Sequence, residues 1–202
     1  GDNPFTFFVN DTGQLGYIFG NGTTNLEQVN TISGGPTLEI NKWYHATLTF
    51  NGTQKKLYIG GNLVSTITNS TTFTNPLNNK LIIGSYNGSI GCLQGTIGTV
   101  HIYDRALSDA EVLNNYSIYS NRYVSGVITS NLAIYVDPAN PQSYSGGSYI
   151  YNLAGAQYTG VMINGPVYSS EGQGSIFFDG TNDLLSFYIN LNIINEFTVF
   201  VF

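Results

Sequence analysis

The sequence has few of the residues that form disulfides, metal sites and ion pairs. Cys92 is the only cysteine among 202 residues, so an intrachain disulfide is impossible and cysteine-based zinc sites are excluded. Charged residues make up 9% of the chain, well below the quarter or so that is usual in soluble domains. Packing must therefore supply the stability, and we expect neither a metal nor a cofactor.

Basic residues and long apolar runs are scarce as well. Six Lys and Arg stand against twelve Asp and Glu, and no basic cluster exceeds the pair Lys55-Lys56, so we expect no nucleic-acid partner. No apolar run approaches the roughly 20 residues of a membrane-spanning helix, so we expect no membrane insertion. The chain opens on Gly1 with neither Met nor a signal-peptide pattern, which we interpret as an internal cut.

What the sequence does contain is a succession of short apolar runs separated by turn residues. Asn-Gly and Thr-Gly dipeptides supply the positive φ angles that tight hairpin turns require. The pattern predicts an all-β fold, a jelly-roll β-sandwich of two antiparallel sheets. Strands are expected at residues 5–9, 15–19, 43–50, 55–59, 64–68, 81–84, 95–103, 132–137, 149–153, 161–166, 175–179, 184–188 and 197–202.

One helix interrupts the strands at residues 108–116. Ser108 is expected to cap its N-terminus, and Glu111, three residues on, completes a capping box. Residues 117–131 show no firm periodicity and are expected to form a connector.

Four stretches of the first part carry a family resemblance. They are similar to the central strands, closing strand and helix of laminin-G-like domains in the concanavalin A-like lectin/glucanase superfamily. The stretches are residues 43–52 (WYHATLTFNG), 56–61 (KLYIGG), 81–84 (LIIG) and 95–112 (GTIGTVHIYDRALSDAEV). The resemblance implies a jelly-roll module with one short C-terminal helix.

The second part resembles the beginning of the same module, through residues 132–141 (LAIYVDPANP), 151–155 (YNLAG), 163–166 (INGP) and 175–183 (SIFFDGTND). We therefore expect residues 1–116 to be the C-terminal part of one module, 117–131 a connector, and 132–202 the N-terminal part of a second module, as in a window cut from a tandem-repeat protein. The alternative is a permuted or strand-donating arrangement, in which the two parts complete one sandwich within the chain or between neighbours. Strand pairing between the two parts would contradict the interpretation as a window cut from a tandem-repeat protein.

No catalytic residue is expected. The resemblance implies that a glycosidase of this superfamily would carry clustered carboxylates along one strand, and two carboxylates must flank the scissile bond. No Glu-x-Asp-x-x-Glu or Glu-x-Asp-x-Glu cluster occurs, and the glutamates are isolated, at Glu27, Glu39, Glu111, Glu171 and Glu196. His45 and His101 lie in expected strands without a neighbouring nucleophile, so we interpret them as structural, hydrogen-bonded or half-exposed residues.

Three further features invite a functional interpretation. Trp43 can stack on a sugar, although the resemblance implies core packing for it. The turn from Asp179 to Asp183 can offer oxygens to Ca²⁺, but we interpret it as a hairpin turn whose side chains cap their own backbone. Asp104 is interpreted as a partner of Arg105 or as a cap.

Asn-x-Ser/Thr sequons carry little weight in a chain this rich in Asn, Ser and Thr. They occur at Asn10, Asn21, Asn51, Asn69, Asn87 and Asn115.

These observations favour a non-enzymatic structural or attachment component of a virus particle, built from tandem laminin-G-like modules that resemble those of phage or giant-virus proteins. Its expected partners are copies of itself, other virion or surface proteins, and glycans, and its expected location is the virion or an extracellular surface. The alternatives are a bacterial cell-surface carbohydrate-binding adhesin and an accessory domain of a polysaccharide-degrading enzyme.

Overall fold

The computed structural model describes residues 5–20, 25–29, 36–68, 80–86, 90–120, 128–155, 157–189 and 196–201. Within these ranges the chain forms sixteen strands, the helix α1 (Asp109–Ser120) and the single-turn 3-10 helix η1 (Glu171–Gln173). All strand pairs are antiparallel, so the predicted all-β sandwich class is confirmed. No helix in the described ranges is long and apolar enough to cross a membrane.

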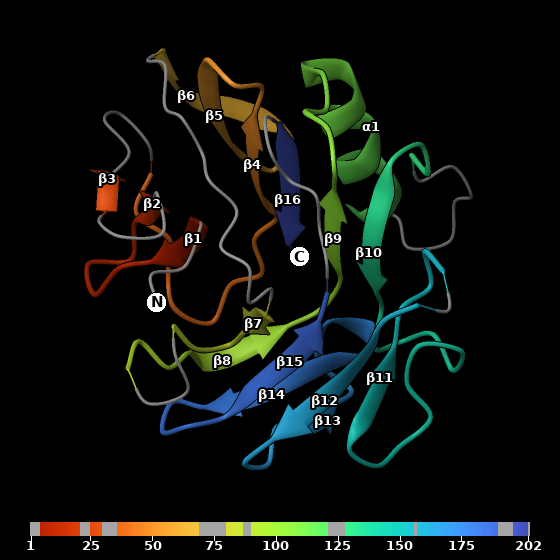
Figure 1. Ribbon diagram of the computed structural model, residues 1–202. Coiled ribbons are helices and arrows are strands. Elements are labelled where there is room, and N and C mark those ends of the chain that lie inside the picture. The colour runs from red at the N-terminus through yellow and green to blue at the C-terminus, as the bar shows by residue number, and fades with distance from the viewer. Residues whose placement is uncertain are drawn as a thin grey trace.

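The largest sheet has six strands in the order β10-β9-β16-β4-β5-β6. Figure 1 shows it in the upper half of the molecule, with α1 beside β9 and β10. Its strands are β4 (Ala46–Phe50), β5 (Gln54–Ile59), β6 (Asn62–Thr68), β9 (Val100–Tyr103), β10 (Leu132–Val136) and β16 (Phe197–Val201).

Two further sheets lie in the lower half of the same view (Figure 1). One has the order β11-β12-β15-β7 and the other the order β13-β14-β8, while β1, β2 and β3 form a separate three-stranded sheet. The strands of the two lower sheets are β7 (Lys80–Ile83), β8 (Gln94–Ile97), β11 (Tyr149–Tyr151), β12 (Thr159–Ile163), β13 (Val167–Ser169), β14 (Ser175–Asp179) and β15 (Leu184–Tyr188). Those of the separate sheet are β1 (Phe5–Val9), β2 (Leu15–Gly20) and β3 (Asn25–Val29).

One hydrophobic core lies between the six-stranded sheet and the sheets below it. Leu48, Ile102 and Val199 from the upper sheet belong to the same buried cluster as Ile176 and Phe187 from the lower ones. Alternating inward residues therefore hold the layers together, as in a sandwich. Lys55 is also buried, and its ammonium lies 5.6 Å from the ring centroid of Phe50.

The two parts of the chain share these sheets. Strand β16 lies between β9 and β4, β10 pairs with β9, and β14 and β15 pair with β8 and β7. The expected division into 1–116 and 132–202 therefore does not separate two bodies here, and the alternative arrangement, with both parts completing one sandwich within the chain, is the one observed. The physical reason is that β4 and β9 would otherwise each present an unpaired strand edge.

Two local expectations also need correction. The single strand expected at residues 95–103 is two strands, because β8 belongs to a lower sheet and β9 to the upper one. Gly98 and Thr99, both buried, link them. The helix continues to Ser120, so the first residues of the expected connector are helical.

Candidate functional site

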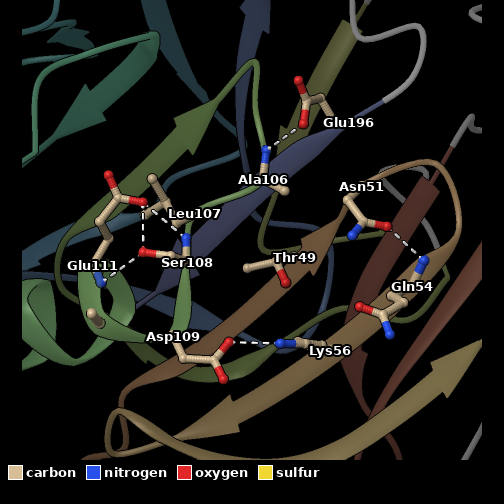
Figure 2. Close-up of a pocket in the computed structure, with 11 residues that line it drawn as sticks. Thr49, Asn51, Gln54, Lys56, Ala106, Leu107, Ser108, Asp109, Glu111 and Glu196 are labelled. Atoms are coloured by element: carbon tan, nitrogen blue, oxygen red, sulfur yellow. Dashed lines mark hydrogen bonds and ion pairs between the residues drawn. The ribbon is translucent and has the colours of Figure 1, made fainter.

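A groove of about 610 Å³ opens where the β4–β5 hairpin faces the first turn of α1. Figure 2 shows its residues converging from the hairpin, from the loop before α1 and from the residue that precedes β16. None of the described residues that line it is aromatic. They are Thr49, Asn51, Gln54, Lys56, Ala106, Leu107, Ser108, Asp109, Ala110, Glu111 and Glu196.

The helix cap forms one wall of the groove. Glu111 Oε2 accepts hydrogen bonds from the Ser108 backbone N–H and hydroxyl at 2.9 Å each, and Ser108 Oγ accepts one from the Glu111 N–H at 3.3 Å. The predicted capping box is thus confirmed. Arg105 donates to both oxygens of Glu111, at 3.0 and 2.8 Å, and these bonds lower the pKa of Glu111 to about 2.

Asp104 is not the partner of Arg105 that the sequence suggested. The guanidinium of Arg105 reaches forward to Glu111 at the start of the helix, while the Asp104 backbone N–H donates to the Asn131 carbonyl at 3.0 Å. The forked guanidinium matches two carboxylate oxygens at once, and that geometry favours Glu111.

Asp109 links the start of the helix to β5 through hydrogen bonds. Its Oδ1 accepts a hydrogen bond from Lys56 Nζ at 2.7 Å and another from the Tyr58 hydroxyl at 2.8 Å. Both bonds, the one from Lys56 first, lower the pKa of Asp109. Burial, together with the bond to Asp109, raises the pKa of Tyr58.

Thr198 of β16 and Glu196, which precedes that strand, contact the loop before α1, and Glu196 lines the groove. Thr198 Oγ1 accepts a hydrogen bond from the Leu107 N–H at 2.8 Å and donates one to the Arg105 carbonyl at 3.0 Å, and its side chain is fully buried. Glu196 Oε2 accepts a longer bond of 3.4 Å from the Ala106 N–H. The groove is therefore assembled from both parts of the chain.

The carboxylates of the groove hold the helix and its preceding loop in place. Glycoside hydrolysis needs a carboxylic acid whose pKa is raised so that it can donate a proton. In Asp109 and Glu111 the pKa is shifted the other way, because cationic donors hold both groups ionised. Asp109, Glu111 and Glu196 all accept hydrogen bonds that fix the helix or its preceding loop.

The two histidines lie inside the protein. His45 and His101 are 2% and 0% exposed, so neither is half-exposed. Burial lowers the pKa of each to about 3, and for His101 the nearby His45 adds to the effect. The His101 ring meets Tyr135 edge-on with centroids 4.5 Å apart, and the His45 ring is tilted against Tyr116 at 5.5 Å. Rings that stay neutral among aromatic neighbours serve packing rather than proton transfer.

Trp43 is not in the core. It is 39% exposed, and its ring covers the turn at Gly172, where a Cβ atom would lie 2.6 Å from the indole. Gly172 also has a φ of 56°, which favours glycine. Trp43 therefore joins the two parts of the chain at the surface.

The turn from Asp179 to Asp183 caps its own backbone. Asp183 Oδ2 accepts from the Asp179 N–H at 3.1 Å, and Asp179 Oδ1 accepts from the Thr181 N–H at 2.8 Å. This matches the hairpin interpretation. In the parts of the chain that the structure describes, no three His, Cys, Asp or Glu residues come together in a group that could hold a metal ion.

Sequence reasoning missed a row of exposed tyrosines on the outer face of the β11-β12-β15-β7 sheet. Tyr149, Tyr151 and Tyr188 are 54%, 48% and 74% exposed. On the opposite face, Ile150 and Phe187 are fully buried. The alternation Tyr-Ile-Tyr at 149–151 and the Phe-Tyr pair at 187–188 were the available signals, because neighbouring strand residues point to opposite faces.

Comparison with known proteins identifies the family to which the chain belongs. The laminin-G-like model of the concanavalin A-like lectin/glucanases superfamily matches residues 1–113, more than half of the chain, and the match ends within α1. No curated protein and no solved structure matches the sequence. The matched part contains the β4–β5 hairpin, the helix cap and most of the groove. The chain belongs to the concanavalin A-like lectin/glucanases superfamily, through a laminin-G-like module.

Proposed function

We propose that this chain is a non-enzymatic module that binds carbohydrate. Its superfamily is described by two activities, lectin and glucanase. One observation favours the lectin side: the carboxylates of the groove accept structural hydrogen bonds, and the pKa of Asp109 and Glu111 is lowered. A glycosidase acid would need the opposite shift.

The surface chemistry supports a sugar ligand. Only 9% of the residues are charged, so amides, hydroxyls and tyrosines meet the solvent. Such groups exchange hydrogen bonds with sugar hydroxyls, and aromatic faces pack against sugar C–H groups. A structural or attachment part of a virus particle, a bacterial adhesin and an accessory domain of a polysaccharide-degrading enzyme would all use this binding function.

The proposal is tested by binding and hydrolysis measured together. The purified chain is titrated calorimetrically with soluble neutral and acidic polysaccharides, and the same mixtures are then assayed for new reducing ends. We expect binding to at least one polysaccharide and no new reducing ends. Reducing ends that appear with the native chain and disappear in Glu196→Gln would overturn the non-enzymatic assignment, and no binding to any polysaccharide would overturn the carbohydrate assignment.

A further inference from the structure

The register of the four-stranded sheet places the exposed tyrosines together on one face. Ile150 pairs with Gly160, and Gly160 pairs with Phe187, so these three residues share the inward row. The residues one position away point outward on all three strands. Tyr151 pairs with Thr159, and Tyr188, which follows Phe187, lies on the other side of Thr159.

The neighbouring row adds Tyr149 at the edge strand, while Ser186 at the other end of that row is buried. Tyr149 pairs with Val161, and Val161 pairs with Ser186. Tyr149 and Tyr151 are two residues apart on β11, a separation of about 7 Å, and Tyr151 and Tyr188 are two strands apart, about 10 Å. Three rings thus stand at the corners of a platform wider than one side chain.

Gly160 allows this platform to sit directly above the core. A Cβ atom on Gly160 would lie 2.4 Å from the Phe187 ring and 2.7 Å from Ile150. The two large inward side chains therefore close over the glycine. Strands β11, β12 and β15 are packed tightly from the inner side, and the outer tyrosines stand on a rigid base, which a binding site requires.

The platform carries hydroxyl groups, and Lys80 pairs with Tyr188 at its β7 edge. Tyr149, Tyr151, Thr159 and Tyr188 each carry one at the surface, and Val161 adds a partly exposed apolar side chain. Tyrosine provides a large apolar ring and a polar tip at a low cost in conformational entropy. A ligand that matches the three rings has alternating C–H faces and hydroxyls.

We propose that Tyr149, Tyr151 and Tyr188 form the glycan-binding face, and that its ligand is a neutral, extended polysaccharide chain with several sugar rings stacked across β11, β12 and β15. This site assignment rests on the proposed carbohydrate-binding function. The groove near α1 is the weaker site, because none of its described lining residues is aromatic.

The experiment uses the full chain and calorimetric titration with neutral oligosaccharides of increasing length, prepared from each polysaccharide that the chain binds. The affinity is expected to rise with length until all three rings are covered. Each of Tyr149→Ala, Tyr151→Ala and Tyr188→Ala is expected to weaken binding about 3- to 10-fold, and the triple variant to abolish it.

Two matched controls locate the effect. Tyr168→Ala removes a tyrosine of similar exposure, 46%, from strand β13 of a different sheet. Asn51→Ala with Gln54→Ala alters the groove. Both controls are expected to bind as the native chain does, and thermal melting checks that every variant is folded.

The outcomes separate the two proposals. If the native chain binds glycans and the folded triple tyrosine variant binds equally well, the site assignment is overturned while the binding function stands. Loss of affinity in the Asn51/Gln54 variant alone would overturn it in favour of the groove. Binding restricted to acidic glycans would overturn the neutral ligand class, and no glycan binding at all would overturn function and site together.

Discussion

The sandwich has two outer faces that both carry tyrosines, and the two sets have opposite surroundings. On the six-stranded sheet, Tyr58 and Tyr103 are fully buried in a cluster with Leu107 and Val112 from the loop and helix above. On the β11-β12-β15-β7 sheet, Tyr151 is 48% exposed. The same residue type is thus part of the packed architecture under α1 and part of an exposed surface on the other sheet.

On the covered face the buried Tyr103 hydroxyl has two partners. Tyr103 donates a hydrogen bond to the Ile128 carbonyl at 3.0 Å and accepts one from Asn115 Nδ2 at 2.9 Å, while Asn115 Oδ1 accepts from the Ile128 N–H at 3.2 Å. This network ties the helix to Ile128, near the end of the expected connector. Asn115 is fully buried, so its sequon is not a glycosylation site in the folded chain.

This comparison indicates that the role of a tyrosine on these sheets depends on whether other elements cover it, and not on the residue type alone. Under α1 the hydroxyls of Tyr58 and Tyr103 are hydrogen-bonded, and an unpaired buried group costs about 1 to 3 kcal/mol. In the open, the tip is solvated at no cost and its ring remains available to a ligand. Unfolding measurements can test this contrast between the covered and open faces.

The largest expected effect on the free energy of unfolding is that of acid, which acts through His45 and His101. Their pKa is about 3 in the folded chain, whereas the ordinary histidine pKa is 6.5, so between these values the unfolded chain binds more protons. Stability is therefore greatest above pH 6.5 and falls as the pH is lowered towards 3. The slope is about 1.4 kcal/mol per pH unit for each histidine, which amounts to several kcal/mol between pH 6 and 4.

Urea unfolding from pH 8 to 4, followed by the fluorescence of Trp43, measures this loss. Trp43 is the only tryptophan, so the signal has a single source. The double variant His45→Gln, His101→Gln is expected to show a much flatter dependence over the same range, whatever its stability at pH 8. An unchanged pH slope in that variant would mean that the histidines are not responsible.

Thr198→Val is expected to cost less, about 1 to 3 kcal/mol, because it leaves the Leu107 N–H and the Arg105 carbonyl without their buried partner. Valine has nearly the same shape, so the hydroxyl is the main change. Thr198→Ser keeps the hydroxyl and should retain most of the stability. Denaturant unfolding measured by fluorescence and by circular dichroism gives the comparison.

The same unfolding curves test whether the two parts fold as one unit. Strand β16 lies between β4 and β9, so both probes should report a single transition with one midpoint in the native chain and in Thr198→Val. Two separate transitions, with only one moved by the substitution, would show that the parts fold independently.

Local patterns in the sequence predicted local structure well, and contacts between distant segments escaped them. The capping box of Ser108 and Glu111 is encoded within four residues, and the alternating runs are sufficient to predict most strands. The Trp43 ring rests on Gly172, which lies far away in the chain, and nothing near Trp43 in the sequence indicates that contact. The two-module division failed to anticipate the shared sheets for the same reason, since neither β4 nor β9 indicates which strand will lie between them.

The candidate site shows this limit most clearly. The groove combines Asp109 and Glu111, which resemble the family pattern, with Glu196, which reaches it only through the position of β16. The tyrosine face depends on a register that brings Tyr151 and Tyr188 to either side of Thr159. Alternation indicates that Tyr149 and Tyr151 share a face of β11, but only the pairing shows that this face is open and that Tyr188 joins it.

A pair of substitutions that each remove one oxygen atom gives the smallest and most direct test of the contrast. Tyr151→Phe, on the open face, is expected to change the unfolding free energy by less than about 0.5 kcal/mol, because water replaces whatever its hydroxyl contacts. Tyr103→Phe, on the covered face, is expected to cost about 1 to 2 kcal/mol, because the Ile128 carbonyl and the Asn115 amide lose a buried partner. Urea denaturation at pH 7.5, where both histidines are neutral in either state, measures the two values under one condition. Equal losses would mean that α1 does not distinguish the faces, and the tyrosines of β11 and β15 would then have to be regarded as structural.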